Sequence, residues 1–386
     1  MLNGTMRTLR YVRSWKVGAD VATEETEFER TGVLVPATLV LPAHRRGPLP
    51  AWIALGGVSR MGRFHPQLMR FAEALASSGA AVLVPEIPEW RSLHVTPEPA
   101  APTIRGCLDV LQERPEVRPG KVGLIGFSFG APQVAIAATT EDLASRVAGI
   151  VLFGGYCSLE RTLSYQFSGR HEWGGVDHRL TPDPYGRWVV GSNHLTDVPG
   201  YEDATDVARA LDRLATAASD QRIAAWDPRH DPLIAELRLG LPSQRRPTFD
   251  LFATPTTGEP PDREARLAMA RQLTEACKRV EPRLEPAPYL ADVSVPTRLI
   301  HGRGDQLIPF TECMRLHEGL PAKARSRRIV TGLFNHSADR REGSALGRAW
   351  EAVAFFNALR GVINTVPSDA GAIDPNDGAA VDPGRP

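Results

Sequence analysis

The sequence has few cysteines and no excess of charge of either sign. Its cysteines lie far apart, and no two have the Cys-x-x-Cys spacing typical of a zinc or redox site. We interpret them as buried free thiols in a reducing compartment; they are Cys107, Cys157, Cys277 and Cys313.

The charges of the chain are balanced. Lysine and arginine together number 45, as do aspartate and glutamate. Nucleic-acid binding needs an excess of basic residues to replace phosphate counterions, so this balance predicts no nucleic-acid partner.

Long apolar runs are also missing. No stretch approaches the roughly 20 apolar residues that span a bilayer, which predicts no membrane partner. Residues 1–7 lack the apolar core of a secretory signal, and we therefore expect a cytoplasmic protein. Hydrophobic residues still make up 42% of the 386 residues, enough for a sizeable core. The length fits two or three units, or one large α/β domain with an insertion.

The pattern of apolar residues in the first half of the chain changes after residue 42. Residues 7–42 contain two alternating segments, Thr8–Val12 and Val33–Leu41, which predict antiparallel strands. Short continuous apolar runs then alternate with helical patterns, which indicates parallel βαβ units in a doubly wound α/β sheet. The runs are Ala51–Leu55, Ala80–Pro85, Val122–Ile125 and Ala148–Phe153, and the helical patterns are Phe64–Ala76, Ile104–Leu111 and Ala131–Thr140.

The alternation stops at Cys157 and returns near residue 297. The interval is rich in Trp, Pro, Arg and Asp and has helical patterns at Asp206–Ala217, Pro232–Leu239 and Arg263–Val280. Strands are expected again at 297–301 and 327–330, followed by a helix at 345–359. We predict a sheet core of residues 1–156 and 291–363, a helical lid or cap insertion at 157–290, and a disordered tail at 364–386.

One pentapeptide has the pattern of a catalytic motif. Gly126-Phe127-Ser128-Phe129-Gly130 fits Gly-x-Ser-x-Gly, in which the serine sits on a tight, strained turn between a strand and a helix. The glycines let this turn pack without Cβ clashes and leave the hydroxyl exposed. A buried strand precedes the motif and a small-residue helix follows it, as the motif requires. Ser128 is therefore the predicted nucleophile; the alternative is an ordinary strand-to-helix turn.

A serine nucleophile needs a base, and the base needs an orienting carboxylate. In α/β proteins that carry this serine motif, the chain order of the three groups is serine, acid, histidine. Asp305 lies just past the carboxyl end of the predicted strand at 297–301, in a glycine-flanked loop, and is the predicted acid. Asp292 is its nearest rival, but it precedes that strand and would lie at the opposite edge of the sheet.

The base is expected after the next strand. His336 follows the strand at 327–330 and is the predicted base. His301 and His317 are poorer choices, because His301 ends its own strand before the acid and His317 lies within a helical pattern.

The developing negative charge needs two backbone N–H donors, an oxyanion hole. The residue after the nucleophile, Phe129, supplies one of them. The other comes from the loop after the first buried parallel strand, Gly56–Gly62, where Val58 is the favoured donor and Gly57 the second choice.

Together these segments resemble the α/β-hydrolase superfamily of serine esterases. The antiparallel start and the stretch from Lys121 to Gly130 are similar to its dienelactone-hydrolase and prolyl-oligopeptidase-like branches. The resemblance covers about residues 30–156 and 291–362. It implies carboxylic ester hydrolysis through an acyl-enzyme, with the triad Ser128, Asp305 and His336. Dienelactone hydrolases proper use a cysteine nucleophile, so this chain departs from them at Ser128.

Several residues are candidates for contact with the substrate. Met61 and His65 flank the oxyanion loop, and the lid aromatics Trp173 and Trp188 could line an apolar acyl or aromatic site. His171, Glu172, Asp177 and His178 lack the helical spacing of metal ligands, so no metal is predicted.

The sequence thus predicts a carboxylesterase acting on a small-molecule ester without a cofactor. The same triad could serve a peptidase, a thioesterase, a C–C hydrolase or an acyltransferase, because it does not set the leaving group. An alternative of another class is a non-catalytic ligand-binding protein on a hydrolase scaffold.

Overall fold

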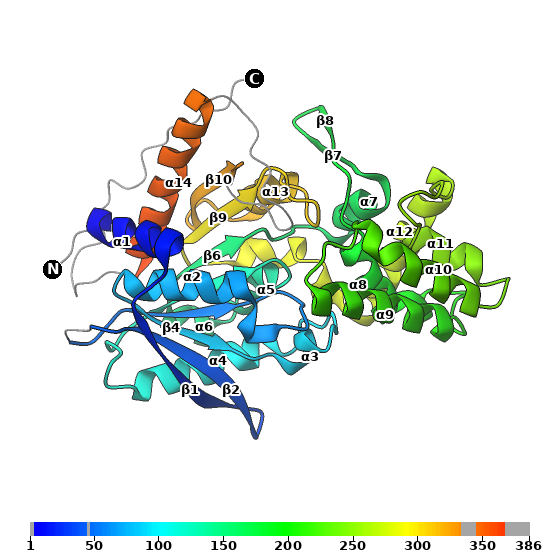
Figure 1. Cartoon of the computed structure of the whole chain (residues 1–386). Helices are drawn as coiled ribbons and strands as arrows, with labels where there is room; N and C mark the ends of the chain where they lie inside the picture. The colour runs from blue at the N-terminus through cyan, green and yellow to red at the C-terminus, as the bar shows by residue number, and fades with distance from the viewer. Residues whose placement is uncertain (1–3, 45–46, 333–344, 367–386) are drawn as a thin grey trace.

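The architecture is seen in a computed structural model that describes residues 4–44, 47–332 and 345–366 (Figure 1). Eight strands form one sheet in the order β1-β2-β4-β3-β5-β6-β9-β10. They are β1 (Val21–Arg30), β2 (Val33–Pro42), β3 (Ala51–Leu55), β4 (Ala81–Pro85), β5 (Val122–Phe127), β6 (Val147–Phe153), β9 (Thr297–Gly302) and β10 (Arg325–Thr331). β2 pairs antiparallel with both β1 and β4, and every other pair in this sheet is parallel. This is the predicted α/β-hydrolase fold with its antiparallel start.

Helices cover both faces of the sheet, because its central strands bury side chains on both sides. Along β3, Trp52 and Ala54 belong to one apolar cluster, while Ile53 and Leu55 belong to the other. The first cluster includes side chains of α1 (Gly4–Val17), α2 (Pro66–Ser77) and α14 (Ala345–Thr365). The second includes side chains of α3 (Pro88–Arg91), α4 (Ala100–Glu113), α5 (Gly130–Ala137), α6 (Glu141–Arg146) and α13 (Thr311–Gly319).

The prediction of a strand at Thr8–Val12 is wrong, since these residues lie in α1. Arg7, Thr8 and Tyr11 are buried on one face of this helix, which is the spacing of a helical stripe. Tyr11 packs edge-on against Phe71 of α2, with ring centroids 5.6 Å apart. Alternation over five residues does not distinguish a strand from such a stripe. The first strand is the charged segment β1 instead.

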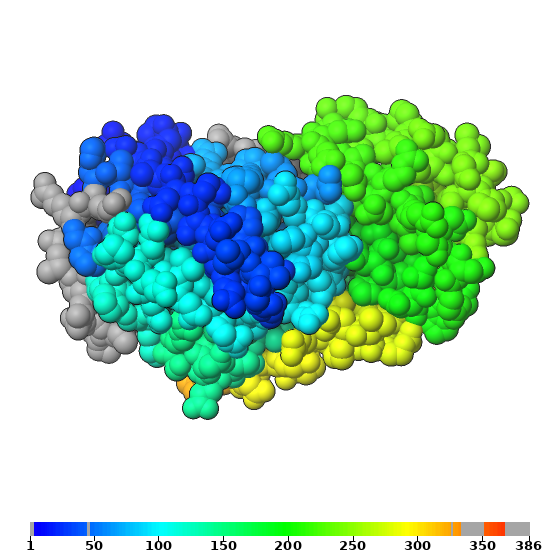
Figure 2. Space-filling model, turned by 90° about the horizontal axis from the view of Figure 1, so that it is seen from below, coloured from blue at the N-terminus to red at the C-terminus, as the bar shows by residue number. Residues whose placement is uncertain are grey.

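A block of helices separates β6 from β9. It contains α7 (Leu159–Ser168), a hairpin of β7 (Arg170–Trp173) and β8 (Val176–Arg179), α8 (Tyr185–His194), α9 (Thr205–Gln221), α10 (Asp231–Gly240), α11 (Arg246–Phe252) and α12 (Arg263–Val280). These elements, α7 to α12, form the helical segment. Figure 1 shows it in green beside the sheet, and Figure 2 shows it as one end of the molecule. The helices predicted within it are confirmed as α9, α10 and α12.

Two further predictions concern the cysteines and the C-terminal tail. All four cysteines are free and buried, as predicted. Helix α14 runs to Thr365, past the predicted start of the tail at residue 364. The rest of the predicted tail, from residue 367, lies outside the described residues.

Candidate active site

Ser128 occupies a strained turn at the carboxyl end of β5. Its φ is +52°, a left-handed conformation that is rare for a residue other than glycine. The Ser128 N–H donates to the carbonyl of Phe153 on β6 at 2.8 Å, and its own carbonyl accepts from the Ala131 N–H at 3.0 Å. The turn is therefore fixed both to the sheet and to the first turn of α5, and the side chain is only partly buried.

The flanking glycines allow three backbone segments to approach one another. A Cβ on Gly126 would stand 2.5 Å from the carbonyl oxygen of Gly130 and 2.6 Å from the Cα of Ala131. A Cβ on Gly130 would collide with the carbonyl oxygen of Gly56. Only glycine fits either position, which is the steric reason for the motif.

The loop after β3 lies directly against the serine. A Cβ on Gly57 would stand 3.0 Å from the Cβ of Ser128 and 3.3 Å from its Oγ. Phe129, on the other side of the serine, is the N-cap of α5, and N–H groups at a helix start have no partner within the helix. Its ring packs edge-on against Trp90, with centroids 5.2 Å apart. The two expected sources of oxyanion donors thus flank Ser128.

The helical segment holds this loop in place. The Tyr185 hydroxyl of α8 donates to the carbonyl of Val58 at 3.4 Å. The Arg60 N–H donates to the Ser219 Oγ of α9 at 3.1 Å, and the Arg60 side chain binds Asp220 at 3.2 Å. Tyr185, Ser219 and Asp220 are not among the site residues predicted from sequence, because nothing in their local pattern marks them.

Asp305 lies just past β9 and is fully buried. Its Oδ1 accepts from the backbone N–H groups of Leu307 at 2.9 Å and Ile308 at 3.0 Å, which fix the orientation of the carboxylate. Strands β3, β5, β6 and β9 are parallel, so Ser128, the Gly57 loop and Asp305 all follow carboxyl ends at one edge of the sheet. Asp292 is exposed and precedes β9.

Of the three histidines considered as the base, two are described. His301 is fully buried; its Nε2 donates to the Ile308 carbonyl at 2.9 Å and lies 3.4 Å from Asp305 Oδ2. Burial alone would lower the pKa of His301, but the neighbouring Asp305 carboxylate and Cys313 thiol outweigh it and raise the pKa to about 10. His317 lies on α13 beside Arg328, and burial together with that charge lowers its pKa to about 4. His336 lies outside the described residues.

The helical segment also contacts the loop that carries the acid. The Tyr165 hydroxyl donates to the carbonyl of Gln306 at 3.2 Å, and the Asp183 N–H donates to the same oxygen at 2.9 Å. In return, the Gln306 side chain donates to the carbonyl of Thr181 at 2.9 Å. One block of helices therefore touches both the Gly57 loop and the Asp305 loop.

The predicted substrate contacts lie in different surroundings. Met61 and His65 border a short 3-10 turn (Gly62–Phe64) and are partly exposed. Trp173 lies on β7, with the Arg315 guanidinium 5.2 Å from its ring centroid. Trp188 is fully buried, and its indole N–H donates to the Phe252 carbonyl at 2.9 Å. Trp188 belongs to the apolar core of the helical segment, and its contact with the substrate stays a prediction.

The histidines weighed as metal ligands form an aromatic cluster instead. His171 and His178 stack with centroids 5.1 Å apart, and both rings lie edge-on to Phe310. Glu172 binds Arg315 at 3.1 Å. Among residues 4–44, 47–332 and 345–366, no three His, Cys, Asp or Glu side chains gather in a way that could hold a metal ion.

None of the described helices is long and apolar enough to cross a bilayer.

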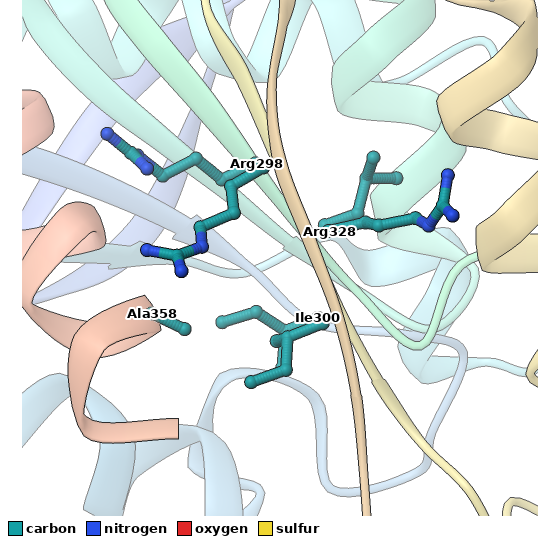
Figure 3. Close-up of a pocket in the computed structure, with 7 residues that line it drawn as sticks. Arg298, Ile300, Arg328 and Ala358 are labelled. Carbon is teal, nitrogen blue, oxygen red and sulfur yellow. The ribbon is translucent and has the colours of Figure 1, made fainter. Parts of the chain in front are cut away.

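Two cavities lie away from Ser128. One, of about 10 Å³, lies between β9, β10 and α14, has Arg298, Ile300 and Ala358 in its lining (Figure 3), and has room for about one water molecule. The other, of about 490 Å³, is an open groove on α10–α12 lined in part by Arg238 and Asp250. Neither includes a predicted site residue.

Comparison with known proteins gives likenesses in structure alone. No family model matches the chain, and no curated protein matches its sequence. A 2,6-dihydroxy-pseudo-oxynicotine hydrolase is similar with a TM-score of 0.47 and 16% identity, over 94% of this chain and 74% of that one. The Pyrococcus horikoshii acylaminoacyl peptidase gives 0.46 and 12%, over 92% of this chain and 43% of the peptidase. A dienelactone hydrolase from Anabaena variabilis gives 0.42 and 15%, over 87% and 95%.

Proposed function

We propose that this chain, which has the α/β-hydrolase fold, is a serine hydrolase that cleaves small-molecule carboxylic esters through an acyl-enzyme. The observation that carries the proposal is the position of Ser128. It combines a left-handed φ of +52° with direct contact to Gly57, and strained backbone of this kind is concentrated at functional sites, where it exposes the nucleophile of this motif. A buried carboxylate, Asp305, follows a parallel strand at the same edge.

In the proposed reaction, Ser128 Oγ attacks the ester carbonyl while His336 takes its proton and Asp305 orients the imidazole. The backbone N–H groups of Val58 and Phe129, with Gly57 as the second choice for the loop donor, hold the oxyanion of the tetrahedral intermediate. Collapse breaks the bond to the alcohol, which leaves with the proton from His336. Water then attacks the acyl-enzyme by the same route, releases the acid and restores Ser128.

The helical segment is proposed to cover the substrate as a lid. Its hydrogen bonds to the loops after β3 and β9, through Tyr185 and Tyr165, support this role. Such a position bounds the space above the serine, so the segment would set which acyl and alcohol groups fit.

The test is hydrolysis of a graded series of activated acyl esters, from acetyl to long chain, by the wild type and by Ser128→Ala. We expect turnover by the wild type with a chain-length optimum, and a loss of at least a thousandfold in kcat in the variant. Parallel assays with an anilide, a thioester and a β-diketone would reveal a peptidase, a thioesterase or a C–C hydrolase. Full activity of Ser128→Ala would refute the proposed nucleophile, and ligand binding without any turnover would favour the scaffold alternative.

A further inference from the structure

We propose that Tyr185 of α8 is a positioning residue for the oxyanion hole, so that the helical segment takes part in catalysis as well as covering the site. The inference rests on the proposed function, because it concerns how the same hydrolase site is oriented. Tyr185 would not touch the substrate. It would act through the loop after β3, which lies against Ser128.

The first argument is that the peptide unit between Val58 and Ser59 is held at both of its polar atoms. Its N–H, that of Ser59, donates to the carbonyl of Trp90 at 3.1 Å. Its carbonyl, that of Val58, accepts from the Tyr185 hydroxyl at 3.4 Å. A peptide unit is planar, so two bonds at opposite ends fix its orientation. Fixing it also restricts the preceding unit, which carries the Val58 N–H, the donor that the proposed function assigns to the oxyanion hole.

The second argument is that the helical segment holds the same loop at another position. The backbone N–H of Arg60 donates to Ser219 Oγ of α9 at 3.1 Å, and the Arg60 side chain binds Asp220 at 3.2 Å. The loop is therefore attached to α8 at Val58 and to α9 at Arg60. Two attachments so close together limit how far the loop can move.

Tyr185 keeps its proton in this environment. Burial raises the pKa of its phenol, as do the charges of Asp183 and Asp220, against the opposing effects of the nearby Ser219 hydroxyl and Arg60. The hydroxyl is therefore a donor at neutral pH, which the bond to the Val58 carbonyl requires.

The expected effect of the Tyr185 hydroxyl on kcat follows from preorganisation of the oxyanion hole. Oxyanion donors stabilise the transition state only if they already point at the developing charge, and loss of one donor costs about 100- to 1000-fold in kcat. Loosening a donor should cost less than removing it. We expect about a tenfold loss when the Tyr185 hydroxyl is absent, and little change in binding of the ground-state ester.

The experiment is Tyr185→Phe, which keeps the ring and removes the hydroxyl. On the best ester of the graded series, kcat should fall about tenfold with KM within twofold. A trifluoromethyl ketone, which forms a tetrahedral adduct with the serine, should bind more weakly by the same factor as the loss in kcat/KM. Tyr201→Phe is the matched control, since Tyr201 packs against the same apolar cluster and should retain wild-type kinetics.

A second variant keeps the test decisive if Tyr185→Phe does not fold. Ser219→Ala removes the acceptor of the Arg60 N–H, which is the other attachment of the same loop, and should give the same split between kcat and KM with a smaller loss. An active wild type, an inactive Ser128→Ala and a Tyr185→Phe with unchanged kcat and ketone affinity would overturn the inference while the proposed function stands. Equal losses in Tyr185→Phe and Tyr201→Phe would also overturn it. A wild type that cleaves no ester would refute the proposed function itself.

Discussion

Gly57 and Ser128 are in direct contact across two loops that leave neighbouring parallel strands. A Cβ added to Gly57 would meet the Cβ of Ser128 at 3.0 Å and its Oγ at 3.3 Å. Carbon atoms in ordinary contact stand further apart than this, about 3.5–4.0 Å, so the glycine allows the loop to reach the serine. The contact places the loop against the proposed nucleophile, where the proposed function requires one of its backbone N–H groups to hold the oxyanion.

Gly57→Ala should therefore impair catalysis more than folding. The methyl group must displace either the loop or the Ser128 side chain, and a misplacement of about 1 Å can cost about 100-fold in rate. We expect a loss of this order in kcat/KM on the best ester. Thermal unfolding and far-UV circular dichroism of the variant should remain close to those of the wild type.

The control for this prediction is Gly240→Ala. An added Cβ there meets nothing within 4 Å, so the variant should keep full activity. Wild-type kinetics in Gly57→Ala would mean that the loop does not need its close approach to Ser128.

The strained turn at Ser128 predicts a measurable difference in stability. Alanine and serine both carry a Cβ that disfavours the φ of +52°, whereas glycine adopts it freely. Ser128→Gly should therefore be more stable than Ser128→Ala, by about 1 kcal/mol in the free energy of unfolding. Urea unfolding at constant m-value would measure this difference. Equal stability of the two variants would show that the turn relaxes without the serine side chain.

The hairpin β7–β8 should make stability depend on pH through His171. Burial, with the charges of His178, Arg315 and His301, lowers the pKa of His171 from 6.5 to about 4. The unfolded chain takes up this proton at a higher pH than the folded chain does. The stability that neutral His171 contributes is thus complete above pH 6.5 and is lost as the pH falls toward 4.

Thermal unfolding between pH 7.5 and 4.5 tests this dependence. His171→Phe keeps a ring against Phe310 and His178, and its Tm should fall less with decreasing pH than that of the wild type. His44→Gln alters an exposed histidine near Asp20 and should leave the wild-type slope unchanged. Identical slopes in the wild type and His171→Phe would contradict the prediction.

The sheet could be predicted from the sequence because its parallel strands are buried on both faces. Continuous apolar runs such as Ala51–Leu55 follow from that burial. The strand predicted at Thr8–Val12 is part of helix α1 instead, because a five-residue alternation also fits one face of a helix whose buried residues include Thr8 and Tyr11. A local sequence pattern distinguishes a helix from a strand least reliably where the segment is short and only half-buried.

The residues of the candidate site also differ in how far local sequence predicts them. Ser128 and Asp305 could be placed from sequence because each follows a recognisable strand, and strand ends in a parallel sheet meet at one edge. Tyr185, Ser219 and Gln306 could not, since they meet their partners through the tertiary packing of helices far apart in the chain. The role of Trp188 cannot be predicted from sequence either, because an aromatic residue in the core and one that lines a pocket have the same local sequence pattern.

The most direct measurement is covalent labelling with a fluorophosphonate, followed by mass spectrometry of the modified peptide. The account predicts one label, on Ser128, in the wild type. Ser128→Ala should take up none, His336→Ala should label far more slowly, and His317→Ala should label like the wild type. A label on another residue, or undiminished labelling of Ser128→Ala, would contradict the claim that Ser128 is the nucleophile.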